Sequence, residues 1–545
     1  MSARALLASA AIVAVATGAY YPLTRNEFVD YDDLGHIVAD PVVTAPFDAE
    51  TIRSAFSVSR AVAYWQPLTV VSLAADHAIF GSNPLGYHLE NLFWHLATSL
   101  VVLALFYRAT REFWRAVAVA ALFATHPIAV ESVGWAIERR AVLAGFLGLA
   151  SFLAYSEWTR RRVPWRYLAS LLLFAGSLLA KGLLLPGAAM LLAFNFWPLR
   201  RSDWKRSILE AIPFAAIGIA VGGAVLHTIG PDLPGEPPLS LRLENALVLP
   251  FRQLLHLAWP LDLGVYYPYP LQVPAWQWVL AGAGWLAISA GAFALRRRAP
   301  YLLFGWAWFV VALLPTLGLK QRGQWAALAD RHAYLAALGA YAAAVWGVAD
   351  LARRGHRFLA PALAGVALVA LSALTVRQVG FWKDTVTLFA RADEVADRPD
   401  EYVKYGLGKA LVDEGRFEEG EAFLRQAIAI APTHYEACYA LGRAYLLDGK
   451  GRDAMAAEFL RSAIYLDPKH VGARATLGSA LNRLGRYSDT VALLEDGPFV
   501  PEARFNLGVA YASLGQPDLA SKQALALGDS PLGRALWEFI ARQRR

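Results

Sequence analysis

Long apolar segments alternate with short polar ones through the first 380 residues of the chain. A helix that crosses a membrane needs about 20 mostly apolar residues. Eleven segments approach or reach this length, at residues 4–22, 89–107, 115–131, 141–157, 166–181, 183–198, 207–228, 276–295, 301–318, 333–350 and 358–376. The pattern predicts an all-α fold, a polytopic membrane bundle of about 11 spans covering residues 1–380.

Every second connection between these segments is basic. The arginines and lysine of these five loops are Arg108, Arg111 and Arg115; Arg160, Arg161, Arg162 and Arg166; Arg200, Arg201, Lys205 and Arg206; Arg296, Arg297 and Arg298; and Arg353, Arg354 and Arg357. Loops rich in Lys and Arg stay in the cytoplasm. The pattern therefore places the N-terminus inside and everything after residue 376 outside. The first segment also has the features of a cleaved signal peptide, an alternative that leaves the later topology unchanged.

Two further apolar stretches do not fit a full span. Residues 67–80 lie in an acidic outer loop, 23–88, and suit a helix in the membrane interface. The stretch from Leu243 to Leu263 carries Arg252, His256 and two prolines. A span there would invert all later loops against their charges, so we expect an interfacial or re-entrant helix on the outer side.

From residue 381 the chain is polar and repetitive. Four Leu-Gly pairs end at Gly408, Gly442, Gly478 and Gly508, each followed seven residues later by another glycine, and Pro432 and Pro468 close the first two repeats. A period near 34 residues with these positions is the tetratricopeptide signature, which predicts an α-solenoid over residues 381–545. Its concave face would bind a peptide or protein, or the array would serve as a stabilising or oligomerising stalk.

Composition supports the membrane assignment and narrows the function. The chain is 57% hydrophobic and 17% charged with a mean hydropathy of +0.37, too apolar for a soluble protein of this length. Its net charge of +7 is concentrated in the loops, where it sets topology and does not indicate nucleic-acid binding. The single cysteine, Cys438, excludes an intramolecular disulfide and fits a repeat core. No nucleotide-binding glycine loop, nucleophile elbow or metal-ligand spacing occurs, so no cofactor is indicated, although a divalent cation remains possible.

Arg and Lys residues on the outer side indicate a functional role, because the positive-inside rule disfavours positive charges in outer loops. Five different segments place Arg139, Arg140, Lys181, Arg252, Lys320, Arg322 and Arg331 at outer ends of spans or in outer loops. Together they indicate an anionic ligand. Each one alone is also explained by lipid headgroups or by pairing with a local carboxylate.

Acidic and other polar residues accompany them. Asp32 and Asp33 follow the first span closely and would serve as general base and charge stabiliser, or as a solvated turn. His126 and Glu131 stand where a span breaks at Pro127, and would either flank a reacting group or cap and pair there. His88, Asn91 and His95 share a helical face, where contacts between helices are the simpler explanation.

At these residues the chain resembles the transmembrane and tetratricopeptide-repeat O-mannosyltransferases and their bacterial relatives, membrane glycosyltransferases of the GT-C type. The resemblance rests on Tyr31-Asp32-Asp33, Tyr64 with Pro67-Leu68, Gly86-Tyr87-His88 with Asn91 and His95, His126-Pro127 with Glu131, Ser132, Trp135 and Arg139, Gln321 with Ala329-Asp330-Arg331 and Tyr334, and Trp382-Lys383-Asp384 with Leu388-Phe389. The chain departs from the family at Gln66 and His332, where relatives have Arg and often Tyr.

The resemblance implies sugar transfer at the outer face, with inversion, from a polyprenyl-phosphate sugar to a hydroxyl acceptor such as protein Ser or Thr. Asp32 or Asp33 would be the base. The substrate-binding residues would be His126, Glu131, Arg139, Lys181, Arg252, Gln321, Asp330, Arg331 and Tyr334. Arg331 would bind the lipid phosphate, and Asp330 would orient the side chain of Arg331. The bacterial relatives imply an inner membrane with the repeats in the periplasm. An envelope scaffold and a transporter of lipid-linked sugars are the alternatives.

The charge pattern gives a topology that reporter fusions test. Alkaline phosphatase, which is active only outside the cytoplasm, is expected to be active when fused after residue 376 and inactive when fused at Arg161 or Arg297, because the basic loops lie inside. The reverse pattern would contradict the topology.

Overall fold

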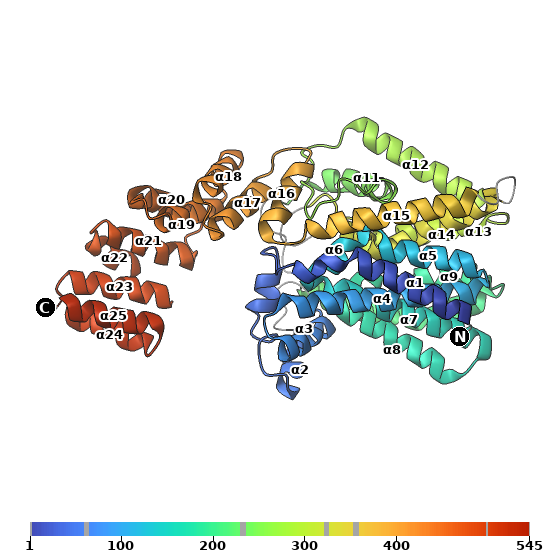
Figure 1. Cartoon of the computed structure of the whole chain (residues 1–545), viewed down its shortest axis with the longest axis horizontal. Coiled ribbons are helices and arrows are strands. Elements are labelled where there is room, and N and C mark those ends of the chain that lie inside the picture. The colour runs from blue at the N-terminus through green and yellow to red at the C-terminus, as the bar shows by residue number, and fades with distance from the viewer. Residues whose placement is uncertain are drawn as a thin grey trace. The chain divides into compact units, whose positions relative to one another are not determined.

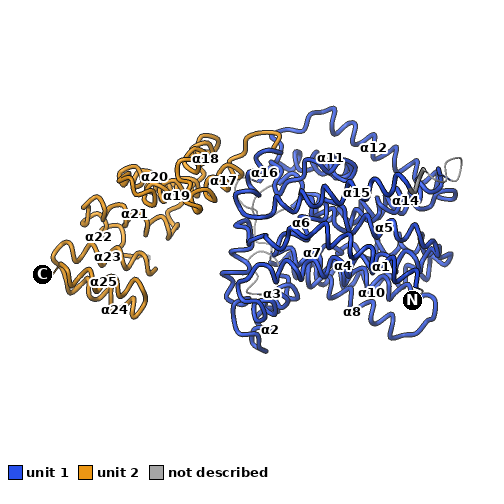
Figure 2. The backbone as a smooth tube through the Cα atoms, viewed as in Figure 1, with its two compact units in different colours: residues 1–395 blue, residues 396–545 orange. Residues whose placement is uncertain are grey.

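The computed structural model describes residues 3–58, 65–228, 236–320, 326–352, 359–497 and 500–543. Within these ranges the chain forms helices and short turns and no strand, with one isolated bridge between Pro268 and Ala326. The chain divides into two compact units, residues 1–395 and 396–545 (Figure 2). The all-α fold class predicted from the sequence is confirmed.

The first unit is a bundle of long helices with shorter ones at its ends (Figure 1). Its α-helices are α1 (Ala3–Ala19), α2 (Ala49–Ala55), α3 (Pro67–Phe80), α4 (Pro84–Thr110), α5 (Phe113–Thr125), α6 (Val130–Gly134), α7 (Arg139–Arg161), α8 (Pro164–Ala180), α9 (Gly187–Phe196), α10 (Trp204–Thr228), α11 (Leu239–Ala258), α12 (Ala275–Ala294), α13 (Pro300–Leu313), α14 (Ala333–Ala352), α15 (Leu359–Gly380) and α16 (Thr385–Val395). Proline at the first helical position starts α3, α4, α8 and α13, where its missing N–H costs no hydrogen bond.

Among the described residues, six helices are long and apolar enough to cross a membrane: α4, α7 with the turn before it, α10, α12, α14 with the turn before it, and α15. A seventh span results if α5 and the following Pro127–Gly134 segment, bent by 51°, are taken together. The other four expected spans coincide with the shorter apolar helices α1, α8, α9 and α13. Helix α9 has 10 residues and is therefore about 15 Å long, half the hydrocarbon thickness. Length and composition thus support six or seven spans, and the expected number of about eleven is not confirmed.

The two stretches expected to lie in the interface are helical. Helix α3 covers residues 67–80, and α11 covers most of the stretch from Leu243 to Leu263 and contains Pro250. Helix α11 is not among the candidate spans of the described residues. Its amide side chains hold the segment before α14, since Asn245 donates to the carbonyl of Ala327 at 2.8 Å and Gln253 to that of Ala329 at 2.7 Å.

The segment Trp382-Lys383-Asp384 and helix α16 pack on the loop after α1. The backbone N–H of Glu27 donates to the carbonyl of Lys383 at 2.8 Å, and that of Asp30 donates to Thr385 Oγ1 at 2.9 Å. Arg391 of α16 donates to the carbonyls of Leu261 and Leu263. Helix α16 therefore belongs to the first unit, which ends at Val395, whereas the sequence places the domain boundary at residues 380–381.

The second unit consists of helix pairs in series (Figure 1). Its helices are α17 (Glu401–Asp413), α18 (Phe417–Ile430), α19 (Tyr435–Leu447), α20 (Asp453–Leu466), α21 (Val471–Arg483), α22 (Tyr487–Leu494), α23 (Pro501–Ser513), α24 (Pro517–Leu527) and α25 (Pro531–Gln543). The two glycines of each repeat are required for different structural reasons. A Cβ on Gly442 would lie 2.7 Å from Leu460 of the partner helix, whereas Gly449 closes a turn at a φ of +69°. Cys438 lies in the core of these repeats, 3% exposed.

Candidate functional site

The centre of the candidate site is a buried carboxylate, that of Glu138, at the end of a 3₁₀ turn directly before α7. Its Oε1 accepts a hydrogen bond from Arg140 Nε at 2.6 Å, and its Oε2 accepts one from Lys181 Nζ at 2.6 Å. The Nε of Arg331 lies 4.0 Å from Oε1. An unpaired carboxylate would be strongly disfavoured here, so Glu138 holds together cations from the start of α7, the end of α8 and the turn before α14.

A second buried carboxylate, that of Glu131 in α6, fixes Arg331. Its Oε2 accepts the backbone N–H of Arg331 at 2.7 Å, and its Oε1 pairs with the guanidinium of the same residue. The side chain of Asp330 does not do this, contrary to the expectation from the sequence. Its two oxygens lie 2.7 Å from His256 Nδ1 and 2.6 Å from the Tyr267 hydroxyl. Neighbouring residues of a 3₁₀ turn point about 120° apart, so Asp330 and Arg331 face different partners.

Aromatic rings lie against the guanidiniums. Trp135, which is 1% exposed, has the guanidinium carbons of Arg331 and Arg140 at 5.4 and 5.7 Å from its ring. The rings of Tyr31 and Trp382 flank it, with centroids 4.9 and 5.7 Å away. The aromatic wall restricts water around the cations, and this strengthens their interaction with an anion.

The two aspartates of the outer loop differ sharply in environment. Asp33 is fully buried, and its two oxygens accept the backbone N–H groups of Val29 at 3.1 Å and Ile137 at 2.9 Å. Burial raises the pKa of Asp33 to about 7, although both backbone N–H groups favour the charged form. The Asp32 side chain is 37% exposed, with Oδ2 3.6 Å from Arg140 Nη2. Asp33 therefore fastens the loop to the turn before α7, and Asp32 presents the accessible carboxylate at the cation cluster.

Lys181 is the cation most sensitive to this environment. Burial lowers the pKa of Lys181 to about 8, with Arg140 and Arg331 acting in the same direction and Glu138 opposing them. Arg140 and Arg331 remain charged at any physiological pH. The cluster thus combines two permanent positive charges with one amine whose charged form depends on the Glu138 carboxylate.

Two residues of the predicted site, Arg139 and Tyr334, lie elsewhere in the bundle. Arg139, fully buried, pairs with Asp76 at 2.8 Å and Glu90 at 3.2 Å and donates to Asn91 at 2.7 Å. Tyr334 and His95 are joined by a hydrogen bond of 2.9 Å between the hydroxyl and Nδ1. Both sets link helices and do not reach the cation cluster.

His126, Arg252 and Gln321 complete the predicted set. His126 Nδ1 accepts the backbone N–H of Ile128 at 3.1 Å, which fixes the bend between α5 and α6, and its Nε2 lies 3.0 Å from the carbonyl of Leu257. Arg252 donates to Gln277 at 3.3 Å. Gln321, and with it Arg322, lies outside the described residues.

Glu138 was missed in the sequence, as were His256 and Tyr267. The signal for Glu138 was available, because it is an acid directly before two arginines at the outer end of a predicted span. No group of three or more His, Cys, Asp or Glu side chains suited to a metal ion occurs in the part of the chain that the structure describes. A divalent cation as cofactor stays a prediction.

Comparison with known proteins agrees with both units. The tetratricopeptide repeat family model matches residues 411–457. The protein O-mannosyl-transferase TMTC1 of Homo sapiens is 26% identical over 513 residues, covering 80% of this chain and 57% of the relative. Protein O-mannosyl-transferase F38B6.6 of Caenorhabditis elegans is 22% identical over 453 residues (76% and 61%), and Tmtc2 of Drosophila melanogaster is 32% identical over 124 residues (22% and 13%). The chain spans less than two thirds of the length of each of these relatives.

Neighbouring arginines provide a test of the site's boundary. Arg139→Gln is expected to destabilise the protein by about 3–5 kcal/mol, because it leaves the buried Asp76 unpaired. Arg140→Gln should lower the free energy of unfolding by clearly less, since Glu138 keeps Lys181 and Arg331 as partners. Thermal unfolding of the purified protein in detergent measures both. Equal losses of stability would mean that the cation cluster is as structural as the Arg139 network.

Proposed function

Because the chain is homologous to the protein O-mannosyl-transferases with tetratricopeptide repeats, we propose that it is a membrane glycosyltransferase. It moves a sugar from a polyprenyl-phosphate donor to a hydroxyl acceptor, protein Ser or Thr, at the outer face of the membrane. The observation that carries the proposal is the convergence of Arg140, Lys181 and Arg331 next to the accessible carboxylate of Asp32. In a bacterial cell the site and the repeats would face the periplasm.

The cations suit the leaving group. Three cations, Arg140, Lys181 and Arg331, balance the carboxylates of Glu138, Glu131 and Asp32, so one positive charge becomes available for the phosphate when Asp32 takes up the proton of the acceptor. When the bond between the anomeric carbon and the phosphate oxygen breaks, the oxygen keeps the electron pair and the phosphate gains negative charge. Fixed cations in a site shielded by Trp135 stabilise this growing charge without reorganising.

Asp32 fits the role of the general base. As the acceptor oxygen forms its bond to the anomeric carbon, its proton passes to the Asp32 carboxylate, so that atoms and charges balance. Attack from the side opposite the phosphate in a single displacement inverts the anomeric carbon. Asp33, buried and engaged by two backbone N–H groups, holds the loop that carries this base.

The repeats suit the acceptor. The curated relatives are named as transferases acting on proteins, and tetratricopeptide arrays form surfaces that bind peptides. The second unit would bring the acceptor protein to the membrane, and the first unit would carry out the transfer.

The two aspartates separate catalysis from structure. Asp32→Asn is expected to lower turnover by about 10²- to 10⁴-fold without loss of thermal stability, because it removes an exposed base. Asp33→Asn should instead destabilise the protein by about 1–3 kcal/mol, because an amide has a single oxygen for the two backbone donors. The assay uses the full chain in nanodiscs with radiolabelled polyprenyl-phosphate sugars and a hydroxyl peptide. Full activity of Asp32→Asn would rule out the base.

Arg331 tests the phosphate clamp. Arg331→Lys keeps a positive charge for Glu131 and Glu138 but loses the two parallel hydrogen bonds that a guanidinium gives a phosphate, so turnover should fall. Arg331→Ala should lower turnover by roughly 10²- to 10³-fold, the effect of losing one fixed charge stabiliser.

The matched control is Arg53→Ala in the outer loop, whose side chain is 80% exposed and pairs with Glu50. A surface pair contributes at most about 1 kcal/mol, so kinetics should stay unchanged. Steady-state rates with the donor varied give both constants. If Arg331→Lys and Arg331→Ala, each still folded by thermal unfolding, keep wild-type turnover and donor KM, the clamp is wrong.

A further inference from the structure

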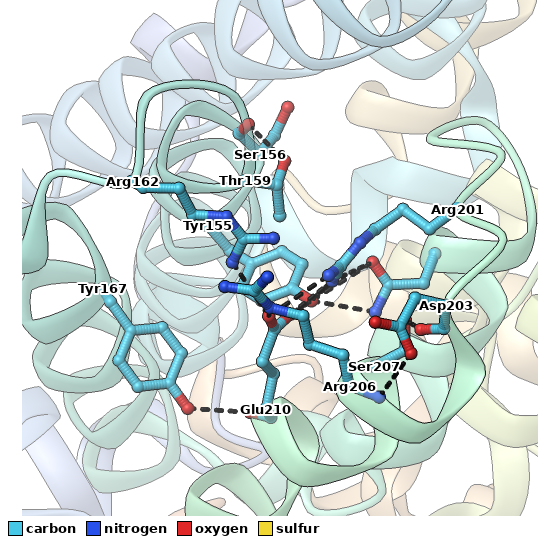
Figure 3. Close-up of polar contacts among 11 residues, drawn as sticks. Tyr155, Ser156, Thr159, Arg162, Tyr167, Arg201, Asp203, Arg206, Ser207 and Glu210 are labelled. Carbon is cyan, nitrogen blue, oxygen red and sulfur yellow. Dashed lines mark hydrogen bonds and ion pairs between the residues drawn. The ribbon is translucent and has the colours of Figure 1, made fainter.

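A second arginine cluster lies at the C-terminal end of α7, the end opposite to Glu138, and Figure 3 shows its polar contacts. The carboxylate of Glu210 in α10 is bound by three arginines from three elements. Arg162, which caps α7, donates to Oε1 at 2.9 Å, Arg206 of α10 donates to it at 3.0 Å, and Arg201 binds both oxygens. The hydroxyl of Tyr155 donates to Oε2 at 2.7 Å.

The cluster carries an excess of positive charge. Glu210 alone faces three guanidiniums, and the neighbouring Glu157 faces three more, those of Arg108 at 3.1 Å and of Arg160 and Arg166 at 3.7 Å. Segments 157–166 and 200–210 together contain eight basic and three acidic residues, a surplus of five positive charges. Such a surplus calls for an anion.

The three arginines of Glu210 differ in how they are used. Arg201 is the most buried of the three, with a side chain that is 12% exposed, and both of its terminal nitrogens bind the carboxylate. Arg162 and Arg206 are 35% and 52% exposed, and each reaches Glu210 through a single nitrogen. Both side chains are thus partly exposed while the carboxylate holds them in place, and the guanidinium of Arg162 also lies 4.3 Å from the centre of the Trp158 ring. This arrangement is preorganised for a phosphate, which accepts several N–H groups at once.

Exposed apolar side chains begin directly beyond these arginines. On α8 they are Trp165, Leu168 and Leu172, which are 64%, 56% and 64% exposed, and on α10 they are Ile208, Leu209 and Ile212, which are 51%, 65% and 53% exposed. Tryptophan at this level is typical of the membrane interface. A molecule with a phosphate at the arginines and hydrocarbon chains along α8 and α10 would match both parts of the surface.

Topology alone does not require this arrangement. The positive-inside effect needs only basic residues in a loop, and solvated side chains fulfil it. Here residues from the end of α7, the connection after α9 and the start of α10 converge on one largely buried carboxylate, 8% exposed, and the carbonyl of Glu210 also accepts the Tyr167 hydroxyl at 2.8 Å.

We propose that Arg162, Arg201 and Arg206, held by Glu210, form a binding site for the phosphate headgroup of an anionic phospholipid in the leaflet on the side of the basic loops. The acyl chains of the lipid lie on the exposed apolar faces of α8 and α10. This site is separate from the sugar-transfer site and does not depend on the transfer activity.

The test measures lipid binding to the full chain. The purified protein in a neutral detergent is titrated with phosphatidylglycerol, with phosphatidylcholine and with inorganic phosphate, and native mass spectrometry counts the bound molecules. We expect phosphatidylglycerol to bind and the other two not to bind at the same concentration. Arg162→Gln with Arg206→Gln should weaken phosphatidylglycerol binding by about tenfold or more, the effect of losing charge-assisted hydrogen bonds to phosphate.

The matched control is Arg297→Gln with Arg298→Gln, which removes the same charge from another basic loop, where both arginines are exposed. In this control variant the binding of phosphatidylglycerol to the protein should change less than twofold. A second pair, Arg162→Lys with Arg206→Lys, keeps the charge and the fold and should show an intermediate loss. The proposal is overturned if phosphatidylcholine binds as well as phosphatidylglycerol, if inorganic phosphate alone occupies the site, or if both glutamine pairs weaken binding equally.

Discussion

One end of the helical bundle of the first unit depends on one buried charge, the carboxylate of Glu138. Glu138 directly precedes α7, and its negative charge is balanced by Arg140, Lys181 and Arg331, which come from three different segments of the chain. Arg331 must then be shared with Glu131, and this fixes the turn before α14 against the bend between α5 and α6. Replacing either carboxylate by an apolar residue would leave like charges a few ångströms apart. The positions of the cations are thus consequences of the acids that they neutralise.

Local patterns could be predicted from the sequence, and pairings could not. The repeat glycines were predictable because Gly442 meets Leu460 and Gly449 adopts a positive φ, both properties of one helix pair. Arg139 and Arg140 looked alike, yet one turns into the network of Asp76 and the other toward Glu138, because adjacent positions of a helix face directions about 100° apart. The span count is not confirmed where breaks shorten the helices, as at α9, whose length an apolar run does not reveal.

Helix α7 connects the two charged regions. It contains 23 residues and is therefore about 35 Å long, close to the thickness of a bilayer's hydrocarbon core. Glu138 precedes its first residue, and Arg162 follows its last one. Helix α8 returns from the arginine-rich end to Lys181. One helical hairpin therefore fixes the separation of the cation cluster at Glu138 from the arginines at Glu210, and a lipid held at one end would constrain the depth of the other in the membrane.

The cations around Glu138 and Glu131 have a consequence for the step that would follow sugar transfer. In the proposed reaction the donor is a phosphate diester with one negative charge, whereas the lipid product is a monoester whose negative charge approaches two near neutral pH. The same three cations would therefore hold the product more tightly than the donor. Departure of the spent lipid, and not cleavage of the sugar bond, would then set the pace of the cycle. Accumulation of free lipid phosphate in the membrane would slow the enzyme.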